Sequence, residues 1–326
     1  MSERDLLRTF VKRSVIVVAA LAGLAVLGGT TPAVAIVGGR DATQPYPAVA
    51  AVSVAIPGVG TALCGGTLLA SRWLVTAAHC VSDDTVAPAP VAVPASRVTA
   101  RVGSLDRTQG GIVVTGKRVV LHPDWAWGTN PGPVADLALV ELAVPAPVAT
   151  LSPATDTPGP GDAVRLLGWG FTRFPPGPGS LPAVLQELDT AVLDPQVCAA
   201  GFPAVGEICM DGGACYGDSG SPALQPARPS RANTGTGTGT GLGGVWAAAG
   251  VASREATADG SCGVSVYTDL TYPPFRIWAA TVMAGRPVPP CVCPPSPANG
   301  NRSAVDPATA DRVALLHRRD LIPADR

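Results

Sequence analysis

Charge is scarce in this chain of 326 residues. Charged side chains make up 14% of it, the formal net charge is -1, and no block of Lys or Arg occurs. Nucleic acids and anionic membrane surfaces attract proteins through dense positive charge, which this sequence does not offer. We therefore expect no nucleic-acid partner, and no membrane partner for the mature protein.

Glycine and proline, by contrast, are abundant, with 38 and 34 copies. Both residues disfavour long helices and favour short strands joined by turns. Since 47% of the residues are hydrophobic, the chain has ample material for a buried core. The composition therefore favours an all-β fold.

The first 35 residues have the three regions of a secretory signal. Basic residues within the first 13 positions precede an apolar run over 15–27, and Ala-Val-Ala at 33–35 satisfies the small-x-small rule of signal peptidase. The apolar run is shorter than the roughly 20 residues that a membrane-spanning helix needs. We therefore predict a signal peptide over 1–35 and a secreted, extracellular protein, in which the eight cysteines suit a disulfide framework.

Short apolar runs broken by Gly and Pro predict strands in two halves of similar size. These runs cover residues 49–53, 67–69, 98–102, 112–115 and 137–142, then 163–167, 185–193, 245–252 and 264–267. The stretch between the halves, 145–161, is rich in Pro, Thr and Ala and is predicted to be a linker.

Three segments stand apart from the predicted strands. The Thr-Gly repeat at 234–241 cannot bury a side-chain face and is predicted to be a mobile surface loop. Helical spacing of apolar residues predicts a helix over 272–284, with prolines in its first turn. The tail over 285–326 is Pro-rich and then charged, and we expect it to be disordered or loosely attached.

Three residues point to nucleophilic catalysis. Ser219 stands in Gly-Asp-Ser-Gly at 217–220, and a serine hydroxyl needs a base whose tautomer is held by a third group. His79, at the end of an apolar strand, is the candidate base, because the other two histidines lie in a loop-like stretch and in the tail. Asp136 opens a buried strand, where it can accept from an imidazole. Each residue alone has a structural interpretation, as a turn residue, a core histidine and a loop-end cap.

Together these residues resemble the chymotrypsin/trypsin family, in its secreted bacterial form, whose members carry His, Asp and Ser in this order. The resemblance covers about residues 36–284. It includes Ile-Val-Gly-Gly at 36–39, Cys-Gly-Gly-Thr at 64–67, Ala-Ala-His-Cys at 77–80, His-Pro at 122–123, Asp-Leu-Ala-Leu at 136–139, Gly-Trp-Gly at 168–170, Gly-Asp-Ser-Gly at 217–220 and Val-Tyr-Thr at 266–268.

The resemblance implies two six-stranded antiparallel Greek-key barrels, over about 36–145 and 160–270, followed by the helix 272–284. The active site would lie in the cleft between the barrels. The implied activity is that of a serine endopeptidase, which hydrolyses protein or peptide substrates through an acyl-enzyme without a cofactor or metal. We expect a monomer. The alternative is a secreted binding module of the same fold with weak or no activity.

The resemblance also implies residue roles. His79 would take the proton of Ser219, Asp136 would hold the imidazole tautomer, and the N–H groups of Gly217 and Ser219 would form the oxyanion hole. Ser253 matches the family serine that supports the triad aspartate and lines the primary pocket.

Activation and disulfides follow from the same resemblance. The new amine of Ile36 would pair with Asp218. Signal peptidase would expose this amine if it cleaves after residue 35. The alternative is an earlier cut by signal peptidase, followed by a second protease that exposes Ile36. The implied disulfides are Cys64–Cys80, Cys198–Cys209 and Cys215–Cys262. Cys291 and Cys293 have no counterpart in the family, and their state is left open.

The primary pocket departs from the family pattern. Counting back from Ser219 places Gly213 at the pocket base, where trypsin-like members carry an aspartate, although Asp211 is close enough to move inward. On the opposite wall Glu255 replaces a glycine, where it narrows the pocket, attracts a basic side chain or pairs with Arg254. These departures favour relaxed or non-tryptic selectivity, with trypsin-like selectivity through Asp211 or Glu255 as the alternative.

Overall fold

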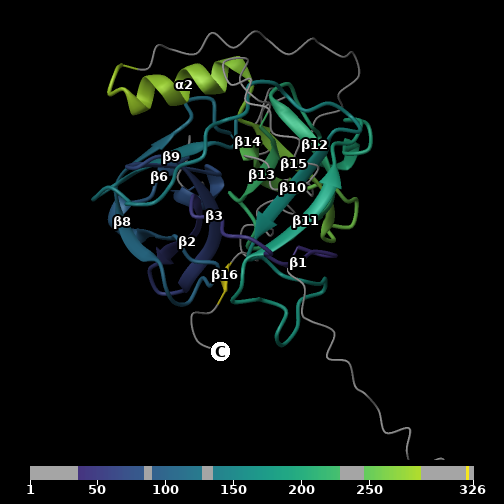
Figure 1. Ribbon diagram of the computed structural model, residues 1–326, viewed down its shortest axis with the longest axis horizontal. Coiled ribbons are helices and arrows are strands. Elements are labelled where there is room, and N and C mark those ends of the chain that lie inside the picture. Colours follow the sequence, from purple (N-terminus) through teal and green to yellow (C-terminus); the bar gives the residue numbers. More distant parts are fainter. Residues whose placement is uncertain (1–35, 84–89, 127–134, 228–245, 288–320, 323–326) are drawn as a thin grey trace, which may run out of the picture. The chain divides into compact units, whose positions relative to one another are not determined.

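Two antiparallel sheets and one α-helix make up most of the part of the chain described by the computed structural model, residues 36–83, 90–126, 135–227, 246–287 and 321–322 (Figure 1). The predicted signal peptide, the Thr-Gly repeat, both tail cysteines and most of the tail lie outside these residues. Within the described ranges, no helix has the length and apolarity needed to cross a membrane.

The first sheet closes into a six-stranded barrel. Its strands run in the order β3-β2-β7-β8-β9-β4, and β4 pairs back onto β3. They are β2 (Val49–Ile56), β3 (Gly60–Ala70), β4 (Trp73–Thr76), β7 (Val98–Val102), β8 (Ile112–Leu121) and β9 (Ala138–Leu142). Alternate burial along β7 follows from the two-residue period of a strand, which turns Val98, Ala100 and Val102 into the barrel core. The first predicted barrel is therefore confirmed.

The second sheet contains the other six expected strands and a short edge strand. The order is β1-β11-β10-β13-β14-β15-β12. The strands are β1 (Arg40–Asp41), β10 (Ala163–Gly168), β11 (Gln186–Ala191), β12 (Glu207–Ala214), β13 (Pro222–Pro226), β14 (Trp246–Glu255) and β15 (Gly263–Asp269). A closed barrel would need β12 to pair with the β11 side of the sheet. Here a single isolated bridge joins Val192, just after β11, to Met210 on β12. This sheet is thus a half-barrel rather than a regular closed barrel.

A bulge interrupts β12. Its register against β15 shifts between Met210 and Ala214, where Gly212 and Gly213 adopt φ values of 66° and 88°. Such positive φ values are readily available to glycine and break the extended conformation of a strand. The bulge turns the backbone just before the candidate nucleophile turn, and it therefore affects which residues reach the substrate pocket.

Two short pairings complete the strands of the described residues. β5 (Ser82–Asp83) pairs with β6 (Val91–Ala92), and β16 (Leu321–Ile322) pairs with Thr61 and Ala62 of β3. The dipeptide Leu321–Ile322 extends the edge of the first sheet, while most of the tail lies outside the described residues, so its predicted disorder stays a prediction.

The helix α2 (Pro273–Met283) agrees with the predicted helix over 272–284. Prolines are tolerated at its start because the first backbone N–H groups of a helix have no partner within it. Phe275, Trp278 and Val282 are buried, whereas Ile277 is 63% exposed. The rings of Phe275 and Trp278 pack edge-on against His122, with centroids 5.1 and 4.9 Å away.

This packing predicts a pH-dependent stability. Burial lowers the pKa of His122 from 6.5 to about 4, despite the opposing attraction of Asp124, whose backbone N–H donates to Nδ1. Between these pH values the unfolded state binds more protons than the folded state, so stability falls as the pH drops from 6.5 to 4. We expect roughly 2 kcal/mol of this loss to be absent in His122→Phe, as measured by urea unfolding at pH 6.5 and 4.5. Equal losses in both proteins would contradict the prediction.

Candidate active site

His79 lies directly beyond the end of β4. The buried residues Ala77 and Ala78 follow the strand, and His79 then begins a short 3-10 turn, His79–Val81. The disulfide from Cys80 to Cys64 on β3 fixes this turn to the first barrel. The imidazole is only 5% exposed, so its position is set by packing as well as by hydrogen bonds.

Asp136 lies just before β9, and both of its carboxylate oxygens accept hydrogen bonds. Oδ1 accepts from the backbone N–H of His79 at 2.9 Å, and Oδ2 lies 2.7 Å from Nδ1 of the same residue. The Ser253 hydroxyl donates to Oδ2, also at 2.7 Å. Because a carboxylate accepts only, the neutral imidazole carries its proton on Nδ1 and leaves Nε2 as a proton acceptor.

The electrostatic surroundings favour an ionised Asp136. Its complete burial would by itself raise the pKa of the carboxyl group. Attraction to His79 and the hydrogen bonds from His79 and Ser253 outweigh that effect, so the pKa lies below its usual value. The carboxylate is therefore charged at neutral pH and able to stabilise an imidazolium.

Ser219 lies in the turn between β12 and β13, against the first barrel. Its carbonyl accepts from the backbone N–H of Gly65 at 2.6 Å, and Gly65 adjoins Cys64, the disulfide partner of the residue after His79. A Cβ on Gly65 would collide with Ser221, and one on Gly220 would collide with the side chain of Thr76 on β4. Glycine at these positions thus lets the serine turn approach the segment that carries His79.

The residues next to Ser219 are held by the second sheet. Asp218 is fully buried, and its carboxylate accepts from the N–H groups of Gly170, at 2.7 Å, and Cys215, at 3.0 Å. Gly217 has a φ of 92°, which favours glycine. The Ile36 side chain is also fully buried and belongs to the core of this sheet. Both members of the predicted activation pair are therefore inside the same half of the protein.

A hollow beside Ser219 contains some of the predicted pocket residues. Its lining consists of Ala214, Cys215, Asp218, Ser219, Ala252, Ser253, Arg254, Glu255 and Ser265. Ser253 and Glu255 line it, as the sequence predicts. Ala214 and Ser265 also line it, and sequence reasoning missed both, although Ser265 directly precedes the Val-Tyr-Thr motif.

Gly213 and Asp211 are not among the residues that line this hollow, and their place in the substrate pocket stays a prediction. A Cβ on Gly213 would run into the Ile36 side chain, and the carbonyl of Gly213 accepts from the N–H of Val37 at 2.8 Å. Asp211 is exposed on β12. Both residues lie in the irregular part of β12, where the register shifts and Gly212 and Gly213 have positive φ values.

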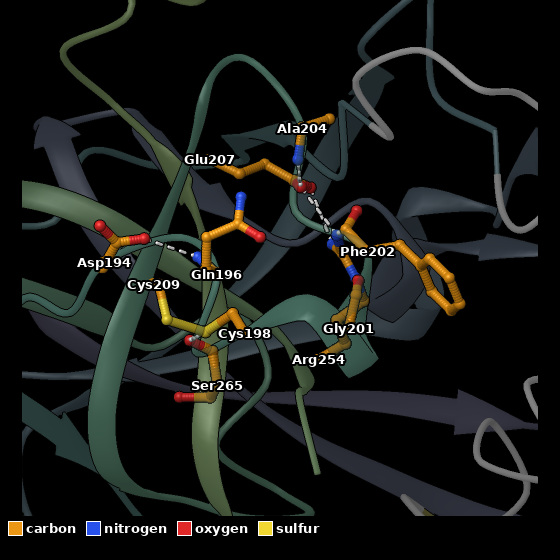
Figure 2. Close-up of a disulfide and its surroundings, with 10 residues drawn as sticks. All are labelled: Asp194, Gln196, Cys198, Gly201, Phe202, Ala204, Glu207, Cys209, Arg254 and Ser265. Carbon is orange, nitrogen blue, oxygen red and sulfur yellow. Dashed lines mark hydrogen bonds and ion pairs between the residues drawn. A yellow bond between two sulfur atoms is a disulfide. The ribbon is translucent and has the colours of Figure 1, made fainter. Parts of the chain in front are cut away.

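Sequence reasoning also missed Glu207, which forms an ion pair with Arg254 across the second sheet (Figure 2). The two residues are 47 positions apart, and their strands both pair with β15 rather than with each other.

Three disulfides occur within the described residues, and they join the pairs that the resemblance implies. Potential metal-ligand atoms of Cys64, Cys80 and His79 lie within 4.8 Å of one another. The two sulfur atoms are bonded to each other, so neither is a thiolate available to a metal.

The two-sheet architecture, the C-terminal helix and an imidazole oriented by a buried carboxylate beside a serine turn define a chymotrypsin-like protein. A family model described as Trypsin matches residues 36–272, and the chain belongs to this trypsin-like serine protease family.

Curated relatives agree with this family. The chain is 30% identical to "Trypsin Blo t 3" of Blomia tropicalis, over 49% of this chain and 62% of that protein. It is 33% identical to "Trypsin" of Sarcophaga bullata, over 49% and 63%, and 30% identical to "Trypsin" of Sus scrofa, over 51% and 70%. The chain thus spans less than two thirds of the length of the first two relatives. All three are eukaryotic, so the bacterial form of the family stays a prediction.

Proposed function

We propose that this protein is a secreted serine endopeptidase that hydrolyses peptide bonds through an acyl-enzyme. Ser219 is the nucleophile, His79 the general base and acid, and Asp136 the residue that orients the imidazole. The observation that carries this proposal is the 2.7 Å contact between Nδ1 of His79 and the buried Asp136 carboxylate, beside the Ser219 turn. Membership in the trypsin family supports protein substrates.

In the proposed reaction Ser219 Oγ attacks the scissile carbonyl carbon while Nε2 of His79 accepts the hydroxyl proton. The N–H groups of Gly217 and Ser219 donate to the oxyanion that develops. When the tetrahedral intermediate collapses, the imidazolium protonates the leaving amine and the acyl-enzyme remains. Water, activated by the same imidazole, then releases the acid and restores Ser219.

Activation is proposed to need the free amine of Ile36. Removal of residues 1–35 would create this amine, which would form an ion pair with the carboxylate of Asp218. A buried carboxylate gains from such a partner, and the pairing would order the turn that contains the oxyanion donors. The burial of both the Ile36 side chain and Asp218 within the second sheet supports this route.

The direct test uses the mature protein beginning at Ile36. It should hydrolyse casein and react covalently with a fluorophosphonate probe, with the label located at Ser219 by peptide mapping. Failure to label under conditions in which pig trypsin labels would reject the proposed function. It would favour an inactive binding module, for which the intact His79–Asp136 contact gives no support.

Selectivity for basic side chains is proposed to depend on Glu255. This residue lines the hollow, whereas Asp211 is exposed outside it. Glu255 is half-buried at the end of β14. A Lys or Arg side chain entering the hollow would therefore meet a carboxylate.

We expect Glu255→Gln to lower kcat/KM for Lys and Arg substrates about fivefold relative to Ala substrates, because a partly exposed ion pair contributes on the order of 1 kcal/mol. Asp211→Asn is the matched control and should leave the ratio unchanged. The measurement is a cleavage-site profile on a peptide library. A wild-type profile dominated by small apolar residues, unaltered in Glu255→Gln, would contradict this prediction.

A further inference from the structure

The guanidinium of Arg254 has an acceptor for each of its five N–H bonds. Nη1 and Nη2 donate to the two oxygens of Glu207, both at 2.7 Å, and Nε donates to the carbonyl of Gly201 at 2.8 Å (Figure 2). The remaining bonds go to the carbonyl of Phe202 and the hydroxyl of Ser253, each at 3.2 Å. This is the parallel two-bond geometry that makes an arginine–carboxylate pair rigid.

The ion pair lies almost entirely away from water. The side chains of Arg254 and Glu207 are 12% and 0% exposed. Glu207 also accepts from the N–H of Ala204 at 2.9 Å, inside the loop closed by the disulfide Cys198–Cys209. Side-chain motion is restricted at both ends, and the charges interact more strongly than an exposed pair does.

Ser253 connects this ion pair to the proposed triad. Its hydroxyl oxygen accepts from Nη1 of Arg254, and its single hydrogen is donated to Oδ2 of Asp136 at 2.7 Å. Because arginine only donates, the hydroxyl cannot turn its hydrogen toward Arg254 without losing both contacts. A continuous series of contacts thus leads from Glu207 through Arg254, Ser253 and Asp136 to His79.

We infer that Arg254 and Glu207 are positioning residues of the proposed catalytic site, which hold the Ser253 hydroxyl as a donor to Asp136 and set the electrostatic potential at His79. This inference rests on the proposed function. The charged groups on the surrounding elements are Asp136 before β9, Asp218 in the serine turn, Arg254 and Glu255 on β14, and Glu207 on β12. Arg254 is the positive group among these residues, and the proposed Ile36 amine adds a second positive charge beside Asp218 in the mature protein. Burial by itself lowers the pKa of the Arg254 guanidinium, but attraction to Glu207, the hydrogen bonds to Glu207 and attraction to Asp136 together raise it.

Removing the charge of Arg254 or that of Glu207 should move the acid limb of the pH profile of kcat/KM. The limb should move in opposite directions in the two variants. In Arg254→Met the negative potential at His79 increases, so the imidazole keeps its proton to a higher pH and the limb moves upward by about half a pH unit. In Glu207→Gln the arginine charge is no longer balanced, so the limb moves downward. Arg254→Lys retains the charge without the fork and should keep the limb near its wild-type position while kcat falls.

The experiment compares the mature wild-type protein with these variants on one peptide substrate between pH 5 and 9. Fluorophosphonate titration counts the competent sites, so that partial misfolding does not enter the rates. The double variant Glu207→Met/Arg254→Met removes both charges together and replaces the single variants if one of them does not fold. Its acid limb should lie at a higher pH than that of Glu207→Gln. Arg165→Met is the matched control, because it breaks a buried arginine–carboxylate pair, Arg165–Glu187, in the same sheet. Arg165 also contacts Tyr46 and Asp189.

Opposite movements in Arg254→Met and Glu207→Gln, with an unmoved limb in Arg165→Met, would support the inference. Movement in the same direction, no movement, or an Arg254→Lys limb that follows Arg254→Met would overturn it while leaving the proposed function intact. A wild-type protein without peptidase activity would reject the proposed function and this inference with it.

Discussion

Replacing Ser219 by alanine is expected to lower kcat for peptide hydrolysis by about 10⁶-fold and to abolish fluorophosphonate labelling. The hydroxyl is the only group of the proposed machinery that forms a bond to the substrate, so no neighbour replaces it. The turn should remain intact, because its contact with the first barrel is made by the Ser219 carbonyl and the N–H of Gly65.

Ser221→Ala provides the matched control for this change. It also removes a hydroxyl from the serine turn, and that hydroxyl has no hydrogen-bond partner among the described residues. Labelling and turnover should therefore persist in Ser221→Ala. Retention of substantial hydrolysis in Ser219→Ala, after purification from host proteases, would show that another residue is the nucleophile.

Replacing Asp136 by asparagine is expected to lower kcat by about 10⁴-fold, with the fold preserved. One carboxylate oxygen must still accept from the backbone N–H of His79, so the new NH₂ group takes the position that faces Nδ1. A donor there requires Nδ1 to be the acceptor, which places the ring proton on Nε2. Nε2 then has no free lone pair with which to accept the proton of Ser219.

The measurement is single-substrate turnover near pH 8, with circular dichroism to verify folding. Asp124→Asn is the corresponding control, since it neutralises a carboxylate 3.9 Å from the other described histidine, His122. It should leave kcat unchanged. A small effect of Asp136→Asn, similar to that of Asp124→Asn, would mean that His79 is not the base.

The strands that the sequence predicts are those with apolar runs and β-branched residues. Strands β2, β7, β9, β10 and β15 lie where these runs occur. β12 and β13 were not among the predicted runs, because the first contains the Gly212–Gly213 bulge and the second begins and ends with proline. Both residue types are typical of turns, and here tertiary pairing outweighs that local preference.

The sequence carries a clear signal for the candidate triad and a weaker one for the pocket. Three short motifs identify His79, Asp136 and Ser219, and the family order relates them across 140 positions of the chain. Counting from Ser219 to Gly213 assumes a regular backbone, which the bulge in β12 does not provide. The pair Glu207–Arg254 gives no local signal, since its members meet only when β12 and β14 are both paired with β15.

The absence of a side chain at Gly213 has a consequence for protein engineering. Grafting the aspartate of trypsin-like members onto this position is an obvious route to cleavage after Lys and Arg. Here its Cβ would be directed at the Ile36 side chain, on a backbone whose φ of 88° disfavours any residue but glycine. The graft would therefore displace the Ile36 side chain, which the proposed activation route places in this core. Redesign of specificity is better begun at Ser265 and Glu255, which both line the hollow beside Ser219.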